Sequence, residues 1–245
     1  GIYDQISDDS ILKRNAEIQA GLCLDALDRT DEAAKRLTAV IDADPEDLDA
    51  VAALGNIYRG RERFKEAAEV YSRGIATITE PNASHWRLYY FRGVANERSK
   101  NWTQAEQDLQ KALELNPDQP QVLNYLGYSW VDMGTNLDEG LEMIRKAVDE
   151  RPNDGYIVDS LGWAYYRLGR YEEAVEQLER AAELRPEDPV INDHLGDAYW
   201  KVGRKLEATF QWNHARDLDP EPADLAKIVK KLESGLAADD TGRDG

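Results

Sequence analysis

Three groups of side chains in this sequence have residue types that could do chemistry. The first is Gly127-Tyr128-Ser129-Trp130-Val131, in which a serine follows a glycine by two residues. A nucleophile turn needs a second glycine where Val131 stands, and it joins a strand to a helix. The residues around Ser129 have helical periodicity instead. We therefore expect no acyl-transfer nucleophile here, and no catalytic residue elsewhere in the chain.

The other two groups could bind a metal ion. Asp132, Asn136 and Asp138 offer the oxygen ligands that calcium prefers, but the glycine and the distal glutamate of an EF-hand loop are misplaced. We interpret this run as a capped turn. The three histidines, His85, His194 and His214, are far apart, and none has a second ligand at metal-binding spacing. We expect no metal and no cofactor, and we interpret His194 as an ordinary helix-surface histidine beside Asp193.

The elements that would position these side chains are helices, and residues 155–188 show them most clearly. Apolar residues recur there at three and four residues along two stretches, which is the spacing of an amphipathic helix. These positions are Leu161, Tyr165 and Leu168, then Ala174, Leu178 and Ala181. Gly169 separates the stretches as a left-handed turn residue, and Pro186 ends the second. The hairpin leaves one apolar face open, so it must stack on a copy of itself.

Copies of this hairpin lie on both sides of it. Residues that match Gly162 recur at intervals of 34 to 38 residues, at Gly21, Gly55, Gly93, Gly127 and Gly196. Residues that match Ala174 are Ala33, Ala67, Ala105, Gly140 and Ala208. The pattern Leu161-Gly162-x-x-Tyr165, Ala174, Leu178, Ala181, Pro186 resembles the tetratricopeptide repeat (TPR), and the resemblance covers residues 14–222.

The resemblance implies an all-α fold, a right-handed α-α superhelix (TPR solenoid) of six helix-hairpin repeats plus a C-terminal capping helix, in a single solenoid domain. The expected units are 14–47, 48–81, 86–119, 120–154, 155–188 and 189–222. Residues 1–13 are expected to be the remnant of a preceding repeat, and residues 238–245 a disordered tail. The capping helix is expected over 223–237, with Lys227, Lys230 and Lys231 directed outward into solvent.

Composition and charge exclude several classes of partner. The chain has 245 residues and a formal net charge of −18, whereas nucleic acid and anionic membranes need basic surfaces. No apolar run reaches the roughly 18 residues of a membrane span, so we expect no membrane insertion by this segment. Cys23 is the single cysteine, so no intramolecular disulfide is possible. It fills a slot that holds alanine in other repeats, which predicts a packed core thiol.

The resemblance also implies where a partner would bind. TPR proteins take an extended peptide or a partner helix in the concave groove lined by the first helix of each unit. Counted from the start of each unit, positions 4, 7, 8 and 11 should pack inward, and positions 2, 5, 9 and 12 should face the groove. We call this second set the groove stripe. The predicted partner-binding residues on or beside it are Tyr90, Asn124, Tyr128, Tyr156, Asp159, Trp163, Tyr166, Arg167, Asp193, Asp197 and Trp200.

Two interpretations of these residues stay open. The aromatic side chains either anchor a partner or only fill the space between successive first helices. The carboxylates either orient a basic or backbone-amide partner or are simply solvated. Asn56 follows Gly55 as in the carboxylate clamp of chaperone-binding TPR domains. Ala52 stands where that clamp has a lysine, so we expect no such clamp in this chain.

The expected function is a non-catalytic protein-protein interaction scaffold or adaptor that binds a peptide segment or partner helix. The alternative is a regulatory or assembly TPR region of a larger enzyme whose catalytic domain lies outside this chain. Because the chain begins at Gly1 and has the look of long bacterial multi-TPR proteins, we expect a fragment of such a protein. That resemblance favours the bacterial envelope or periplasm over the cytoplasm. The oligomeric state is left open.

Overall fold

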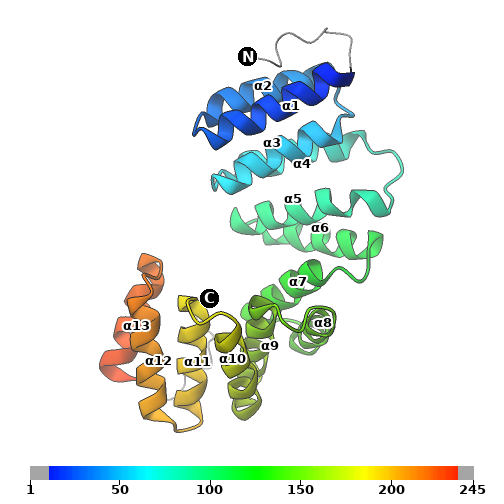
Figure 1. The fold of residues 1–245 in the computed structure, drawn as a ribbon. Coiled ribbons are helices and arrows are strands. Elements are labelled where there is room, and N and C mark those ends of the chain that lie inside the picture. The colour runs from blue at the N-terminus through cyan, green and yellow to red at the C-terminus, as the bar shows by residue number, and fades with distance from the viewer. Residues whose placement is uncertain (1–10, 237–245) are drawn as a thin grey trace. The chain divides into compact units, whose positions relative to one another are not determined.

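The described structure is built from helices, most of them paired in hairpins. The computed structural model describes residues 11–236, and no strand occurs among them. The chain divides into two compact units, residues 1–117 and 118–245, which we call the N-terminal unit and the C-terminal unit (Figure 1). This differs from the single solenoid domain expected from the sequence. In a repeat array each hairpin contacts mainly its neighbours, so the repeat pattern itself does not fix how many compact units form.

The N-terminal unit stacks its helices in pairs along the chain. They are α1 (Ile11–Ala26), α2 (Thr30–Ala43), α3 (Leu48–Gly60), α4 (Phe64–Thr77), the short 3-10 helix η2 (Ala83–His85), α5 (Trp86–Arg98) and α6 (Trp102–Leu115). The apolar core runs between the pairs, and Leu37, Ile41, Leu54 and Tyr71 are fully buried in it. This is the burial expected for helices with one apolar face.

The C-terminal unit continues the same pattern. Its helices are α7 (Pro120–Asp132), α8 (Leu137–Glu150), α9 (Gly155–Arg167), α10 (Tyr171–Leu184), α11 (Pro189–Lys201), α12 (Lys205–Asp217) and α13 (Pro222–Ser234). Each of the six expected units overlaps one helix pair, and α13 begins at Pro222, one residue before the expected capping segment. Of the expected remnant over 1–13, residues 11–13 belong to α1 and the rest lie outside the described residues, as does the expected tail over 238–245.

Helix starts and inter-helix turns follow local sequence chemistry. Asp188 accepts hydrogen bonds from the backbone N–H groups of Val190 and Ile191 at the start of α11, and Pro189 follows it with the φ that a first helical residue needs. Gly169 has φ +75°, as expected from the sequence. The equivalent residue is also left-handed in the other five hairpins, namely Asp28, Glu62, Lys100, Gly134 and Gly203.

The four extra residues before the third expected unit form a compact surface connection. Asn82 caps η2 by accepting from the Ser84 N–H, and His85 Nδ1 accepts from the Asn82 N–H. These residues are mostly exposed. His85 thus has a structural role in the loop.

The environment of Cys23 differs from expectation. Its thiol is exposed, whereas the alanines in the equivalent slots, Ala95, Ala164 and Ala198, are fully buried. Those alanines lie on first helices that pack against the second helix of the hairpin before, as α9 packs on α8. No described helix precedes α1. The prediction of a packed core thiol was therefore wrong, because it assumed a neighbour on that side.

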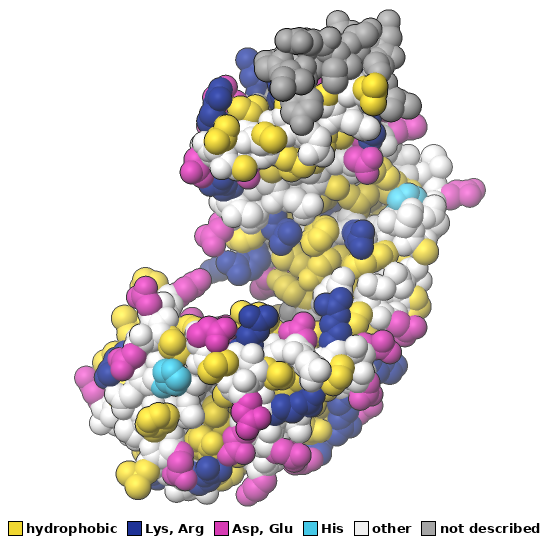
Figure 2. Space-filling model, in the orientation of Figure 1, with side chains coloured by type: hydrophobic (Ala, Val, Ile, Leu, Met, Phe, Trp, Pro, Cys, Tyr) yellow, Lys and Arg dark blue, Asp and Glu magenta, His cyan; other side chains and the backbone are white. Residues whose placement is uncertain are grey.

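Acidic and basic side chains intermingle on the surface in the view of Figure 2. No described helix is both long enough and apolar enough to span a membrane. Within residues 11–236, no three potential metal-ligating side chains come close enough together to hold an ion.

Candidate functional site

The candidate site is a pocket in the C-terminal unit. It has a volume of about 720 Å³ and is lined by residues of α7, α9, α11 and α13. Helix α9 packs against both α7 and α11, so the groove stripes of three successive first helices lie side by side. Tyr128, Trp163 and His194 line the pocket from these helices, and Ile228 and Lys231 line it from α13.

A larger cavity, of about 1010 Å³, lies on α1 and α2 of the N-terminal unit. Several of its charged lining residues already pair with one another, as Arg14 does with Asp47 and Arg36 with Glu17. Volume alone does not make a site; convergent polar groups are also needed. We therefore place the candidate site in the C-terminal unit.

Trp163 lies at the centre of an aromatic stack in this pocket. Its ring centroid is 4.8 Å from that of Tyr166, with an angle of 7° between the planes, and 4.1 Å from that of His194, with an angle of 16°. Only 9% of Trp163 is exposed, and its indole Nε1 is buried without a hydrogen-bond partner in the described chain. The Trp163–His194 pair stabilises the contact between α9 and α11 by about 0.5–1.5 kcal/mol.

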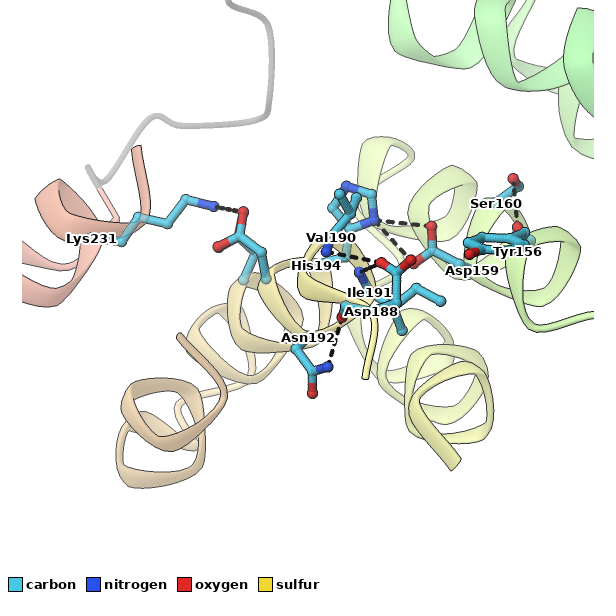
Figure 3. Close-up of polar contacts among 11 residues, drawn as sticks. Tyr156, Asp159, Ser160, Asp188, Val190, Ile191, Asn192, His194 and Lys231 are labelled. Atoms are coloured by element: carbon cyan, nitrogen blue, oxygen red, sulfur yellow. Dashed lines mark hydrogen bonds and ion pairs between the residues drawn. The ribbon is translucent and has the colours of Figure 1, made fainter. Parts of the chain in front are cut away.

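His194 pairs with a buried carboxylate across two helices. Its Nδ1 lies 3.0 and 3.1 Å from the two carboxylate oxygens of Asp159, as Figure 3 shows. Because a carboxylate only accepts, Nδ1 carries the proton. Burial lowers the pKa of His194, but the charge and hydrogen bond of Asp159, together with Asp193 and Asp197, outweigh it and raise the pKa overall. The described chain gives Nε2 no hydrogen-bond partner.

A second buried charge cluster joins α11 to α13. Lys231 Nζ lies 2.7 Å from Asp193 Oδ2 and 2.7 Å from Asp197 Oδ2. Trp212 Nε1 donates to the other oxygen of Asp197 at 2.8 Å. Burial raises the pKa of Asp197, and Lys231 only partly opposes that effect. Burial also lowers the pKa of Lys231, but the two carboxylates raise it more.

These contacts correct several expectations from the sequence. Lys231 was expected to point outward into solvent, but its side chain is only 15% exposed and pairs with two carboxylates of the groove stripe. The interpretation of Asp159, Asp193 and Asp197 as solvated is also wrong, because Asp159 is buried against His194 and the other two carboxylates pair with Lys231. His194 is buried, so it is no ordinary surface histidine. The periodicity that placed these residues could not show which helix covers them.

Buried polar atoms without a partner gather on the groove stripe. Seven side-chain atoms of this kind occur in the described chain, and five belong to stripe residues. One of the five, Arg59 Nε, is in the N-terminal unit. The other four are Gln121 Oε1, Asn124 Oδ1, Trp163 Nε1 and Asp193 Oδ1, all on α7, α9 or α11. Burying such an atom unpaired costs about 1–3 kcal/mol, so each of these atoms would be stabilised by a hydrogen-bond partner.

Several of the predicted partner-binding residues pack inside the protein. Tyr166 is almost fully buried, and Arg167 donates to the backbone oxygen of Asp132 at the end of α7. Trp200 contacts Gly235 just after α13, and Lys205 Nζ lies 3.5 Å from the centroid of its indole ring. For these residues the geometry favours the space-filling interpretation.

Other predicted residues remain at the groove surface or belong elsewhere. Tyr156 is 51% exposed, with the Arg185 guanidinium 4.9 Å from its ring centroid. Tyr128 is partly covered, and burial, followed by the charges of Asp132 and Asp159, raises its pKa. Tyr90 belongs to the N-terminal unit, where burial raises its pKa.

Two residues of the site, His194 and Lys231, were not predicted from the sequence. A signal for His194 does exist: it lies 35 residues after Asp159, one repeat further on. In a stack of repeats such pairs face each other across neighbouring first helices. Lys231 stands 34 residues after Asp197 on what would be the next first helix, and the same comparison would have found it.

Comparison with known proteins agrees with this architecture. Tetratricopeptide repeat profiles match residues 19–81, 86–119 and 162–203. A TPR repeat-containing protein of Pseudomonas aeruginosa is 32% identical over 151 residues, which is 60% of this chain and 24% of that protein. The chain thus spans about a quarter of that relative's length.

Solved structures with the same fold include two TPR proteins. YrrB, described as a TPR protein with an unusual peptide-binding site, has a TM-score of 0.57 at 22% identity, over 76% of this chain and 91% of YrrB. A tetratricopeptide repeat protein from Parabacteroides merdae has a TM-score of 0.69 at 17% identity, over 92% of this chain and 86% of that one. At these identities the likeness concerns the fold, and the expectation of an all-α helical-repeat fold is confirmed.

Proposed function

Because this chain is a tetratricopeptide repeat protein, we propose that it is a non-catalytic interaction scaffold whose C-terminal unit binds an extended peptide segment of a partner protein. The segment lies along the groove stripe of α7, α9 and α11 and enters the pocket beneath α13. The description of YrrB as a protein with a peptide-binding site supports this class of function.

The observation that carries this proposal is the set of unpaired buried atoms at Gln121, Asn124, Trp163 and Asp193. They include a donor, the indole N–H, and acceptors on the amide and carboxylate side chains. A polypeptide backbone offers one N–H donor and one C=O acceptor per residue. Its C=O groups can accept from the indole N–H, and its N–H groups can donate to the amide and carboxylate oxygens. In a helix those groups are already bonded within the helix. The atoms therefore favour an extended segment over a partner helix.

The pocket also indicates the side chains of that segment. Its lining carries Asp132, Asp193, Asp197 and Asp224 against Lys227, Lys230, Lys231 and the partly basic His194. With acidic and basic groups nearly balanced, a segment of strong charge gains little there. Tyr156 and Val190 are large, exposed and one repeat apart on the stripe. An uncharged segment with spaced apolar side chains fits both features.

Peptides selected from a random displayed library against this chain provide the test. Asn124→Leu removes an unpaired buried acceptor, so the free protein should unfold at a higher urea concentration. The same change should weaken the selected peptides about tenfold, which corresponds to about 1.4 kcal/mol for one lost hydrogen bond. Trp163→Phe, which keeps a ring in the stack but removes the N–H, should weaken them similarly.

Gln211→Leu is the matched control, because Gln211 Oε1 is also buried and unpaired but lies on α12, off the stripe. It should raise the urea midpoint and leave peptide affinity unchanged. The proposal is wrong if the library yields no specific binder, or if Asn124→Leu and Gln211→Leu affect affinity equally.

A further inference from the structure

One nitrogen of the His194 ring is held inside the protein, and the other faces the candidate pocket. Nδ1 lies 3.0 and 3.1 Å from the two carboxylate oxygens of Asp159 (Figure 3). The ring stacks on Trp163, and only 11% of the side chain is exposed. Nε2 has no hydrogen-bond partner in the described chain, yet it is not among the buried unpaired atoms of that chain. Nε2 is therefore accessible, and a ligand in the pocket that His194 lines can reach it.

The contact with Asp159 fixes what Nε2 can do. Because a carboxylate only accepts, Nδ1 carries a proton in both the neutral and the charged ring. Nε2 is therefore a hydrogen-bond acceptor when the ring is neutral and a charged N–H donor when the ring is protonated. A backbone C=O of a bound segment can pair only with the donor form.

Acidic side chains around the ring favour its protonated form. Asp159 on α9, and Asp193 and Asp197 on α11, together raise the pKa of His194 in spite of its burial. Lys231 on α13 is already paired with Asp193 and Asp197. Because these three carboxylates outnumber the two cations, a further carboxylate at Nε2 would be repelled overall. An uncharged carbonyl oxygen meets no such repulsion, so it is the acceptor that fits this position.

The other titratable groups of the pocket come from two helices. Its lining includes Tyr128 and Asp132 on α7, and Asp224, Lys227 and Lys230 on α13, but no residue of α10 or α12. Asp132 pairs with Arg167, and Asp224 pairs with Lys227. Burial raises the pKa of Tyr128, so its hydroxyl stays neutral. Burial also raises the pKa of Asp197, to about 6, so the titrations of Asp197 and His194 have to be separated by substitution.

We propose that His194 makes partner binding dependent on pH: its protonated Nε2 donates a hydrogen bond to a backbone C=O of the extended segment, and loss of that proton weakens binding. The neutral ring would instead set the lone pair of Nε2 against the carbonyl oxygen. Asp159 is a positioning residue in this arrangement, because it holds the ring through Nδ1 and leaves Nε2 directed at the pocket. The inference rests on the proposed peptide site and adds to it a contact atom and a means of regulation.

Peptides selected from the displayed library at about pH 6.5 provide the test. Those used should lack histidine and cysteine and have blocked termini, so that the peptide itself does not titrate. An NMR titration of the free protein locates the pKa of His194, and affinity is then measured about one pH unit below that value and about two above it. Kd should rise about tenfold across this range, as for the loss of one hydrogen bond. By linkage, a saturating peptide should raise the pKa of His194 by about one.

Three variants separate His194 from its neighbours. His194→Gln sets an amide that does not titrate near the position of Nε2, so Kd should stay nearly constant over the same range. Asp197→Asn removes the other titration and should keep the pH dependence. Asp159→Asn should move the midpoint of the pH dependence to lower pH, because it removes a charge that raises the pKa of His194. Urea unfolding at each pH checks that the variants are folded.

An unchanged His194 pKa in the presence of saturating peptide would overturn the inference, as would a pH dependence that survives His194→Gln. The NMR measurement uses the unchanged protein, so it does not depend on the folding of a variant. In either case the peptide site itself stands if Asn124→Leu still weakens binding. If the library yields no specific binder, the peptide site and this inference fail together.

Discussion

His194 Nδ1 of α11 lies 3.0 Å from one carboxylate oxygen of Asp159 on α9 and 3.1 Å from the other. Both side chains are buried, and the histidine ring stacks on Trp163. One hydrogen-bonded pair therefore joins two successive repeats directly beneath the candidate pocket. Its protonation state therefore affects the stability of the C-terminal unit.

Asp159→Asn should lower the pKa of His194, because it removes the charge that outweighs burial. A histidine whose folded-state pKa is raised adds stability that is complete below the unfolded pKa of about 6.5 and is lost as pH rises through the folded value. Urea unfolding should therefore show a larger loss for Asp159→Asn at pH 5.5 than at pH 8.5. The His194 imidazole signal in NMR gives the pKa directly, with the signals of His85 and His214 as internal references. An unchanged His194 pKa would contradict this account.

Lys231→Met should destabilise the C-terminal unit by about 3–5 kcal/mol, because it leaves Asp193 and Asp197 buried without their cation. Burial already raises the carboxyl pKa of Asp197, and that pKa should rise further in the variant. The variant should therefore recover stability as pH falls toward the unfolded-state pKa of about 3.9. When Asp193→Asn and Asp197→Asn are combined with Lys231→Met, both negative charges are removed. The urea midpoint of unfolding at neutral pH should then return most of the way to that of the unchanged protein. A loss well under about 1 kcal/mol would mean that Lys231 behaves as a surface residue.

Gly162→Ala should destabilise the fold by about 1–3 kcal/mol, because the new Cβ would lie 2.5 Å from Leu178 Cγ in a fully buried contact. This outweighs the gain of about 1 kcal/mol in helix propensity. Gly60→Ala is the control, since its new Cβ would meet no atom within 4 Å beyond its own stretch of helix backbone. It should be neutral or slightly stabilising. Thermal unfolding of both variants, followed by circular dichroism, makes the comparison, and equal effects would count against the packing argument.

Cys23 should react fully with a thiol reagent in the native protein, because its side chain is exposed on α1. The rate should be within about tenfold of that in strong denaturant, since neither access nor unfolding limits it. Absorbance after addition of an aromatic disulfide measures both rates. Reaction only after unfolding would restore the original prediction of a core thiol.

The sequence alone determined the repeat frame. The spacing of Leu161, Tyr165 and Leu168, and the breaks at Gly169 and Pro186, are local signals that act within one hairpin. The 3.6-residue period of a helix and the burial of one apolar face are sufficient to predict the two helices and the turn from these signals. For this reason the helix pairs and the left-handed turn at Gly169 could be predicted.

Only the tertiary structure decided what the polar side chains do. Asp159 pairs with His194 across 35 residues, and Lys231 pairs with Asp193 across 38. Periodicity places each residue on a face of its own helix but does not say which neighbour covers that face. Cys23 shows the same limit, since its exposure depends on what packs against α1. The partner of a buried charge depends on which helices pack together. The sequence was therefore sufficient to predict the helical repeats, whereas the candidate site could be identified only from the structure.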